Sequence, residues 1–278
     1  MSFKKDECQI CGCKDTKVLS KESFEKDVYE YSICKQCSFV FQTNRYAKEK
    51  YFSLPCKTQK NYVEHSKNRA RYIYDFCTSY LSDKNIKVLD VGCYRGGVMK
   101  YIAKLIKNAD VFGCTIPSKQ KPLKNTNIIY DSFEFMKFKE KCDFIIMSHV
   151  VEHFLDLRNS LRKLKTIMND NALTYIEVPS LDYLKVRLSF EFCPEHLSYF
   201  TVHSLSNLLL SEGFKILKIK ESKYWGNIKV LIQKNNKEII YFHKNKYYIF
   251  YMIGKNCRRF THWFYRFMLK NFNIGANS

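Results

Sequence analysis

The pattern of apolar and polar positions predicts a long alternating region in the middle of the chain. Between residues 86 and 234, short apolar runs alternate with stretches whose apolar positions recur every three or four residues. The runs predict buried strands, and the stretches predict amphipathic helices. Such alternation is typical of an α/β fold, in which a doubly wound, mostly parallel sheet carries helices on both faces. Ligands of such sheets bind at the carboxyl ends of the strands.

The predicted elements follow one another with short connections. The last two strands are expected to form an antiparallel hairpin, which gives a sheet of seven strands in all. We expect strands at 86–91, 110–116, 127–130, 142–148, 173–178, 215–220 and 227–234, with helices at 98–107, 157–168 and 204–210.

The first 45 residues are organised around cysteines. Cys8-x-x-Cys11 and Cys34-x-x-Cys37 are separated by 22 residues. Two such pairs match the ligand number and the spacing of a tetrahedral zinc site. Four thiolates leave no open position for water, so the predicted zinc is structural. A segment this short buries little apolar surface, and zinc would supply folding energy to the predicted zinc ribbon.

A linker and a helical bridge are expected at 46–85. Apolar side chains recur with a helical period from Tyr62 to Leu81, and this helix is expected to pack beside the sheet. Tyr62, His65 and Arg69 share one face of it. These three residues either touch substrate or form ordinary polar surface.

The composition predicts a cytoplasmic location and shows a large positive net charge. No apolar stretch predicts a transmembrane helix or a secretory signal, so the twelve cysteines are interpreted in a reducing cytoplasm. The spare thiol of Cys13 lies beside the metal pattern. The net charge of +20 either attracts polyanions or reflects a solvated lysine surface.

The last segment, 235–278, is rich in aromatic and basic residues and contains a single acidic residue, Glu238. Such a tail could dock on the domain or on a second copy of the chain. Contact with an anionic membrane surface ranks second, and nucleic acid ranks third. The sequence thus divides into a ribbon at 1–45, a bridge, a core domain at 86–234 and this tail.

The residues that begin the alternating region carry candidate chemistry. Residues 88–97 read Val-Leu-Asp-Val-Gly-Cys-Tyr-Arg-Gly-Gly, an apolar strand with an acid that runs through glycines into a helix. Glycines in such a turn let backbone N–H groups approach a ligand closely. The string lacks the Gly-Lys-Ser/Thr ending of a nucleoside-triphosphate loop. It resembles the cofactor turn of class I S-adenosylmethionine-dependent methyltransferases, whose fold also ends in an antiparallel strand pair.

The resemblance implies a cofactor site spread over the ends of four strands. Asp90 would orient the amino acid part of S-adenosylmethionine through the turn, and the side of the adenosine and sulfonium would be lined after the fourth strand. The residues that the resemblance assigns to cofactor binding are Asp90, Gly92, Cys93, Gly96, Thr115, Asp131, Ser132, Ser148 and His149.

Two positions depart from the family pattern. The family usually has a glycine where Tyr94 stands, and an acid that binds the ribose hydroxyls where Thr115 stands. The threonine hydroxyl would replace charge-assisted hydrogen bonds with a weaker one. Weaker cofactor binding, compensation by another residue and a non-catalytic scaffold are therefore all open. A dinucleotide-binding Rossmann protein is less compatible, because it needs G-x-G-x-x-G and an acid about 20 residues further on.

Two Glu-His pairs follow strands of the predicted sheet. Glu152-His153 either holds a divalent metal, together with His149, or caps and packs the next helix. Glu195-His196 resembles the substrate-side loop of zinc-containing sugar methyltransferases, and the resemblance implies that His196 is the general base. An imidazole accepts a proton near neutral pH, and the adjacent Glu195 would raise its basicity.

Together these features predict a class I methyltransferase with an N-terminal zinc ribbon, S-adenosylmethionine as cofactor and a structural zinc. The expected acceptor is a small molecule, in particular a sugar or nucleotide-linked sugar of surface polysaccharide. Oxygen is favoured over carbon as the acceptor atom, because sugar C-methyltransferases carry a further domain that is missing here. The alternatives are an RNA methyltransferase and a non-catalytic scaffold.

Overall fold

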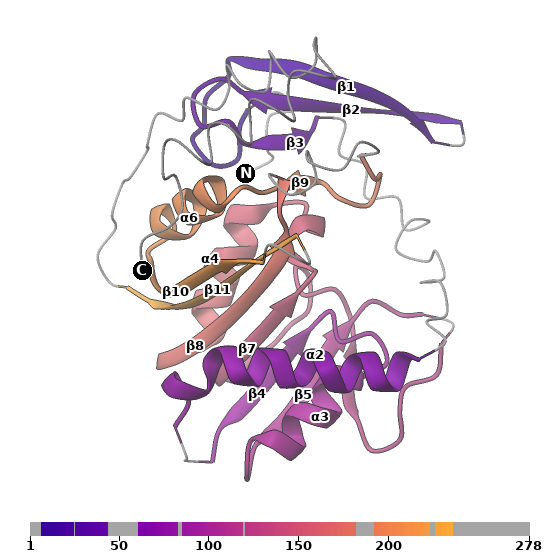
Figure 1. The fold of residues 1–278 in the computed structure, drawn as a ribbon, viewed down its shortest axis with the longest axis vertical. Helices are drawn as coiled ribbons and strands as arrows, with labels where there is room; N and C mark the ends of the chain where they lie inside the picture. The colour runs from indigo at the N-terminus through magenta and orange to yellow at the C-terminus, as the bar shows by residue number, and fades with distance from the viewer. Residues whose placement is uncertain are drawn as a thin grey trace.

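The computed structural model describes residues 7–24, 26–43, 61–82, 85–118, 120–181, 192–222 and 226–235. Most of the predicted linker and nearly all of the predicted C-terminal tail lie outside these ranges. Figure 1 shows a small sheet at one end of the molecule and a larger sheet with its helices below it.

The larger sheet confirms the predicted doubly wound α/β fold. Its strand order is β10-β11-β8-β7-β4-β5-β6. The five strands from β8 to β6 run parallel, and β10 and β11 form the predicted antiparallel pair at one side. The strands are β4 (Lys87–Val91), β5 (Asp110–Thr115), β6 (Asn127–Tyr130), β7 (Cys142–Ser148), β8 (Met168–Pro179), β10 (Phe214–Glu221) and β11 (Asn227–Lys234).

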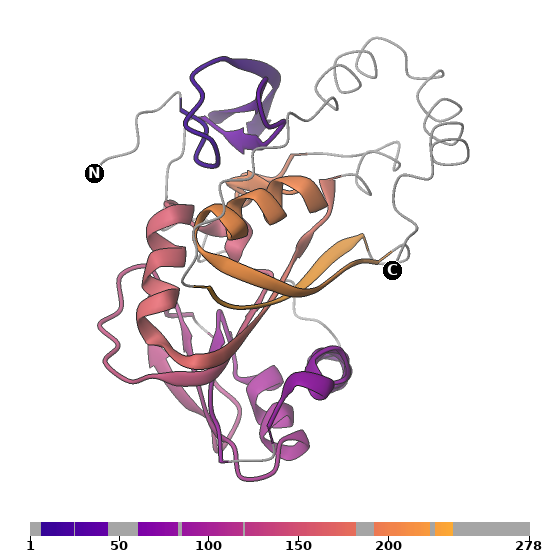
Figure 2. The ribbon, with the colours of Figure 1, turned by 90° about the vertical axis from the view of Figure 1, so that its left-hand side faces the viewer.

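Helices cover both faces of this sheet (Figure 2). Alternate residues of β7 point to opposite faces, so Phe144 and Ile146 belong to one apolar core and Ile145 and Met147 to the other. The first core contains residues of α2 and α3, and the second contains residues of α4 and α6. The helices are α2 (Tyr62–Cys77), α3 (Gly97–Leu105), α4 (Leu157–Ile167) and α6 (Val202–Ser211).

The small sheet is antiparallel and has the order β1-β2-β3-β9. Its first three strands, β1 (Thr16–Phe24), β2 (Asp27–Cys34) and β3 (Val40–Gln42), come from the predicted ribbon. Its fourth strand, β9 (Ser198–Tyr199), comes from the loop that precedes α6. The ribbon therefore shares a sheet with a segment of the core domain, which its own sequence pattern did not indicate.

Several element ends differ from the sequence predictions, and at two of them the difference is four residues or more. Met168, predicted as the last apolar position of a helix, is extended and begins β8, where it pairs with Cys142. An apolar residue at helical spacing is equally suited to a buried strand, and the polar residues that follow it favour leaving the helix. The helix predicted to reach Leu81 ends at Cys77, followed by a 3-10 turn at Thr78–Tyr80.

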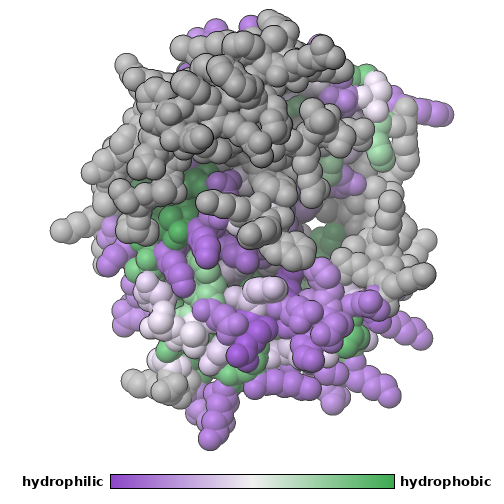
Figure 3. Space-filling view, viewed as in Figure 1, coloured by the Kyte–Doolittle hydropathy of each residue, from purple (hydrophilic) through white to green (hydrophobic). Residues whose placement is uncertain are grey.

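Polar surface dominates the outer side of α2. In the view of Figure 3, hydrophilic side chains cover the lower part of the molecule, over α2 and below it. This is where a chain with a net charge of +20 presents part of its solvated surface. Among the described helices, none combines the length and the apolar character needed to cross a membrane.

Candidate active site and cysteine cluster

One edge of the large sheet collects the predicted cofactor residues. Because β6, β5, β4 and β7 are parallel neighbours, their carboxyl ends follow one another along the same edge. We call this edge, together with the loops that leave it, the carboxyl edge. In strand order it carries Asp131 and Ser132 after β6, Thr115 in β5, Asp90 in β4 followed by Gly92, Cys93 and Gly96, and then Ser148 and His149 at the end of β7.

The bend after β4 has the backbone geometry that its glycines predicted. Gly92 and Gly96 have φ angles of +72° and +78°, which is the left-handed region that glycine adopts at low cost. The N–H groups of Gly92 and Cys93 both donate to the carbonyl of Cys114, at 2.8 and 3.1 Å. The turn is thus tied to the end of β5, and Gly96 precedes the first residue of α3.

Tyr94 occupies the position where the family has glycine, and its backbone explains that preference. Its φ is +52°, so a residue with a side chain lies in the left-handed region, at a cost of about 1–2 kcal/mol. Its ring stands edge-on to that of Tyr62, with centroids 5.6 Å apart. The tyrosine side chain therefore packs against α2.

Two further glycines support the bend, although the sequence pattern assigned them no role. A Cβ added to Gly97 would lie 2.3 Å from Ser66 Oγ, and one added to Gly113 would lie 2.5 Å from Cys93 Sγ. Gly97 also donates its N–H to the Tyr62 hydroxyl at 3.0 Å. A glycine inside an otherwise apolar strand, as at position 113, is the signal that could have indicated this close approach.

Asp90 is the most unusual group at the carboxyl edge. Its side chain is 4% exposed, and Oδ2 has no hydrogen-bond partner among the described residues. Burial raises the pKa of the carboxyl to about 7, although a backbone hydrogen bond from Met99 and the charge of Arg69 act in the opposite direction. A buried acid with a free oxygen beside a left-handed glycine bend is suited to bind a polar ligand.

At the β5 and β6 end of the carboxyl edge the side chains are polar, but the residue that ends β5 is not an acid. Thr115 is 9% exposed and pairs with Tyr130 at the end of β6. Asp131 follows on β6, and its Oδ1 accepts the N–H of Ser132 at 2.7 Å. The acid at this end of the edge is therefore Asp131, which follows β6 instead of ending β5.

At the other end, a network of polar side chains connects α2 to three strands. Arg69 donates to Ser148 Oγ at 2.9 Å, and Ser148 donates to Glu177 Oε2 at 3.0 Å. Asn227 donates to Glu177 Oε1 at 2.8 Å, and its amide nitrogen lies 3.3 Å from His149 Nε2. The sequence interpretation left the role of Arg69 open and missed Glu177 and Asn227, because their strands are brought together only in the sheet.

The two Glu-His pairs meet in space, which the sequence did not predict. Glu152 and His153 lie in a 3-10 turn after β7 (η2, Val151–His153), and His196 lies just before β9. The Leu197 N–H donates to the Glu152 carbonyl at 2.9 Å. The rings of His153 and His196 are 4.9 Å apart, and one ligand atom each from Glu152, His153 and His196 all lie within 4.8 Å of one another.

In the cluster of Glu152, His153 and His196, the pKa values of Glu152 and His196 are both lowered. Burial would raise the pKa of the Glu152 carboxyl, but the imidazoles of His149 and His153 outweigh it and lower the pKa to about 2. Burial lowers the pKa of His196 to about 4, even though the charge of Glu152 opposes this. At neutral pH the cluster therefore contains an ionised carboxylate beside a neutral His196.

Glu195 does not pair with His196. Its Oε2 instead accepts a hydrogen bond from the Cys193 thiol at 2.8 Å. His196 N–H donates to the Cys193 carbonyl at 3.0 Å, and the Tyr199 hydroxyl donates to the same carbonyl at 3.1 Å. The loop is thus held by its own hydrogen bonds, and the acid nearest to His196 within the cluster is Glu152.

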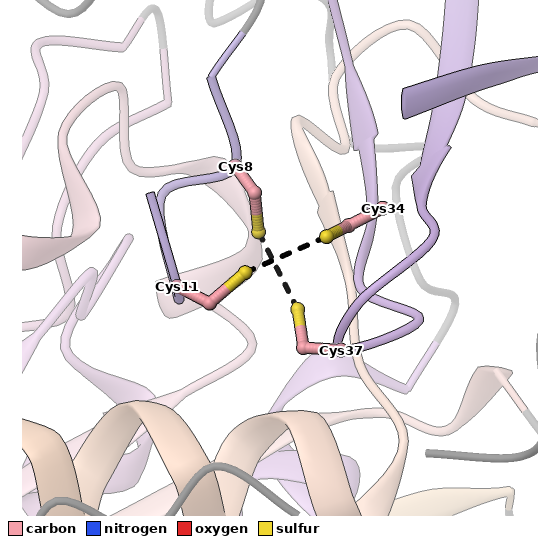
Figure 4. A group of neighbouring side chains, drawn as sticks. All are labelled: Cys8, Cys11, Cys34 and Cys37. Atoms are coloured by element: carbon pink, nitrogen blue, oxygen red, sulfur yellow. Dashed lines mark hydrogen bonds between the residues drawn. The ribbon is translucent and has the colours of Figure 1, made fainter. Parts of the chain in front are cut away.

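The four cysteines of the N-terminal pattern converge as predicted (Figure 4). The sulfurs of Cys8 and Cys37 are 3.5 Å apart, as are those of Cys11 and Cys34, and all four lie within 4.8 Å of one another. Sulfurs around a tetrahedral zinc with bonds of about 2.3 Å are separated by about 3.8 Å. The described cysteines are all free thiols, so this cysteine cluster fits a four-thiolate metal site.

Both cysteine pairs have the same local geometry. The residue after each second cysteine has a positive φ, +70° at Gly12 and +58° at Ser38. Gly12 N–H donates to the Cys8 carbonyl at 2.8 Å, and Ser38 N–H donates to the Cys34 carbonyl at 2.9 Å. Each pair therefore forms a closed turn that directs its two sulfurs to a common centre.

The ribbon is anchored to the core domain close to the histidines. Phe41 of β3 pairs with Ser198 of β9, and Gln42 N–H donates to the Leu197 carbonyl at 3.0 Å. On the other side Gln9 donates to the Leu155 carbonyl at 2.9 Å and accepts from the Leu157 N–H at 3.1 Å. The cysteine cluster and the loop of His196 are thus parts of one packed unit.

The fold and this edge agree with the proteins to which the chain is similar. Residues 62–219 match a family described as a methyltransferase domain, which is more than half of the chain. The chain therefore belongs to the class I S-adenosylmethionine-dependent methyltransferases. The match begins at the first residue of α2, so this helix is part of the family's domain.

Particular relatives are distant. The chain is 26% identical over 131 residues to (S)-tetrahydroprotoberberine N-methyltransferase of Eschscholzia californica, covering 44% of this chain and 37% of the relative. It is 29% identical over 100 residues to a probable (S)-tetrahydroprotoberberine N-methyltransferase 2 of Papaver bracteatum, covering 32% and 28%. The matched segment thus spans only about a third of each curated relative.

Solved structures share the fold. The plantazolicin methyltransferase BpumL in complex with SAH superposes with a TM-score of 0.51 at 16% identity, over 68% of this chain and 93% of that one. A protein from Pyrococcus horikoshii OT3 gives the same TM-score at 15% identity, over 68% and 99%. At this identity the likeness supports the architecture of the large sheet.

Proposed function

We propose that this protein transfers a methyl group from S-adenosylmethionine to a small molecule. The main observation in support is the buried Asp90. Its Oδ2 has no hydrogen-bond partner among the described residues and lies beside the left-handed bend of Gly92 and Gly96. A buried carboxylate oxygen that has no hydrogen-bond partner among the described residues suits the ammonium of an amino acid. Ser132, Thr115 and Ser148 extend the polar lining along the strand ends.

The acceptor is proposed to be a hydroxyl of a sugar or nucleotide-linked sugar. Two observations support a small acceptor: the curated relatives are named for alkaloid N-methylation, and the loop of Glu195 and His196 resembles that of sugar methyltransferases. His196 is the proposed base, since an imidazole that is neutral at pH 7 can accept the acceptor's proton. Glu195 would influence His196 only by holding the loop, because its carboxylate accepts a hydrogen bond from the Cys193 thiol.

The cysteine cluster is proposed to hold a structural zinc. The four sulfurs fill a tetrahedral coordination sphere and leave no position for a substrate. With β3 paired to β9, zinc would stabilise the ribbon and with it the loop that carries His196. We propose the ribbon of residues 1–45 and the domain of residues 86–234 as distinct sequence units that share this sheet. A cytoplasmic location and a docking role for the tail at 235–278 stay predictions.

Calorimetry with the full chain tests the cofactor step directly. We expect S-adenosylmethionine and S-adenosylhomocysteine to bind, and we expect Asp90→Asn to weaken binding by about 10–100-fold, the value of a hydrogen bond to a charged group. Absence of heat and of a thermal shift at millimolar cofactor would support the non-catalytic scaffold instead.

Product analysis tests the acceptor class. With nucleotide-linked sugars offered as a mixture, we expect one to gain a methyl group, and we expect His196→Ala to lower turnover by about 10²–10⁴-fold while cofactor affinity stays the same. A salt-sensitive gel shift with RNA together with methylated RNA would favour the RNA methyltransferase. No turnover of any sugar alongside normal cofactor binding would refute the sugar, but not the cofactor site.

A further inference from the structure

Glu152 is a buried carboxylate for which the described residues supply no hydrogen-bond donor at normal distance. The residue is 1% exposed, and neither Oε1 nor Oε2 accepts a hydrogen bond within the described residues. The nearest ring nitrogen, His149 Nδ1, lies 3.4 Å from Oε1. The imidazoles of His149 and His153 favour the charged form of this carboxyl, and buried charges in proteins are paired in this way or bound to metal.

The orientation of His153 leaves a nitrogen free on the Glu152 side. Its Nδ1 lies 2.7 Å from the backbone carbonyl of Glu195. A carbonyl only accepts, so Nδ1 carries the proton and Nε2 carries a lone pair. This Nε2 is 4.0 Å from Glu152 Oε1. A second-sphere carbonyl that fixes the tautomer in this way is typical of metal-bound histidines.

His196 completes a compact set of three ligands. One ligand atom each from Glu152, His153 and His196 lie within 4.8 Å of one another. Two ligands of a cation with bonds of about 2.1 Å are separated by about 3–4 Å. Side-chain adjustments of up to about 0.7 Å per ligand would close the set around an ion. His153 is partly exposed, which provides a path for the ion.

We propose that Glu152, His153 and His196 bind a divalent transition-metal ion, at a site separate from the cysteine cluster. Two imidazoles and one carboxylate suit zinc, manganese, cobalt or iron(II) better than magnesium or calcium. Three protein ligands leave coordination positions open, unlike the four thiolates of the ribbon.

The position of this site gives the ion a use, and this use rests on the proposed function. Two residues separate the turn η2 from the end of β7, so the ion would lie close to Ser148 and His149 at the carboxyl edge. An open coordination position there would take an oxygen of the acceptor. His196 would then be a ligand, and its role as a free base would apply only to the metal-free enzyme.

Metal stoichiometry of the untagged full chain tests the site without any activity assay. After stripping with chelator and reloading with zinc, elemental analysis is expected to find two equivalents per chain in the wild type and one in His153→Gln. The matched control His65→Gln, on the exposed face of α2, is expected to keep two. One equivalent in the wild type, or two in His153→Gln, would overturn the proposal.

Cobalt provides a readout that does not depend on how well a variant folds. The wild type loaded with two cobalt equivalents is expected to show sulfur-to-metal charge transfer from one ion only, and weak visible bands of a nitrogen and oxygen site from the other. A second equivalent without the latter bands would overturn the proposal. Calorimetry with S-adenosylmethionine on His153→Gln separates the metal site from the proposed function. Because the cofactor site does not include His153, the variant is expected to bind S-adenosylmethionine as the wild type does.

Discussion

The cysteine cluster and the carboxyl edge both concentrate polar side chains in buried surroundings, but they differ in how those groups are satisfied. In the ribbon, four sulfurs face one centre, and a single ion would satisfy all of them. At the carboxyl edge, Asp90 Oδ2 and both oxygens of Glu152 are buried without hydrogen-bond partners in the described part of the chain, while Glu177 nearby has hydrogen bonds to both of its oxygens.

This difference separates stabilising groups from groups suited to binding. A closed ligand set has no position for a substrate and contributes its free energy to folding. A buried acid with a free oxygen destabilises the unliganded fold, and such groups persist where a ligand compensates them. The experiments below test this contrast, in order of decreasing expected effect.

Cys37→Ser should cause the largest loss. Structural zinc contributes about 10–16 kcal/mol of binding free energy in small zinc domains, and three thiolates retain only part of it. We expect one zinc equivalent fewer by elemental analysis and a Tm lower by at least about 6–12 °C, which corresponds to a loss of about 3 kcal/mol. Cys13→Ser is the control, because this thiol lies outside the four-sulfur set. If both variants keep their zinc, the cluster is not the site.

Asp90→Asn should stabilise the unliganded protein at neutral pH, in contrast to Cys37→Ser. The folded-state pKa of about 7 lies above the ordinary aspartate value of 3.8, so the native state keeps a proton that the unfolded chain releases. Stability should therefore fall as the pH rises from about 4 to about 7, by up to about 4 kcal/mol. Denaturant titrations without cofactor are expected to show this slope in the wild type and a flatter one in Asp90→Asn, with higher stability at pH 7. Equal slopes would show that the carboxyl is not strained.

Gly96→Ala and Gly12→Ala form a matched pair across the two regions. Both glycines have left-handed φ angles, so each substitution costs about 1–2 kcal/mol of backbone strain. At Gly96 the new Cβ would also lie 2.8 Å from Thr126 Cγ2, whereas nothing lies within 4 Å at Gly12. Thermal unfolding should show a larger loss for Gly96→Ala, and calorimetry a weaker affinity for cofactor. Equal losses would mean that the bend adjusts freely.

The smallest effect concerns coupling between the two regions. Because Phe41 pairs with Ser198 across β3 and β9, losing the proposed metal of the ribbon should loosen the loop of His196. In Cys37→Ser we expect faster amide exchange around β9 and unchanged exchange at Ile145 and Met147 in the central strand β7. Unchanged exchange around β9 would show that the loop is held by the core domain alone.

Much of the fold was predictable because local patterns and global packing agree. The ranges 127–130, 142–148 and 227–234 were predicted with the bounds that β6, β7 and β11 have. Each is a short apolar run between polar residues, and a buried strand is the main structure such a run can form. The strand β9 was not predictable, since two residues carry no periodicity and their pairing partner lies in the ribbon.

The candidate site was predictable only in part for a related reason. Asp90, Gly92 and Gly96 form a local string, and their geometry follows from a strand that turns through glycine. Glu177 and Asn227 have no such string and become visible only when β8 and β11 pair. For Glu152 the sequence favoured capping and packing over metal binding, because its neighbour in the metal-ligand set, His196, lies on a distant loop.

By itself the sequence determined the alternating α/β order, the cysteine ligand pattern and the glycine bend, because each depends on residues close together along the chain. Only the tertiary structure decided that β9 closes the ribbon's sheet, that Glu195 binds Cys193, and that His196 meets Glu152. These contacts join segments whose separation carries no local signal. Their geometry follows from how the buried faces of the two sheets pack.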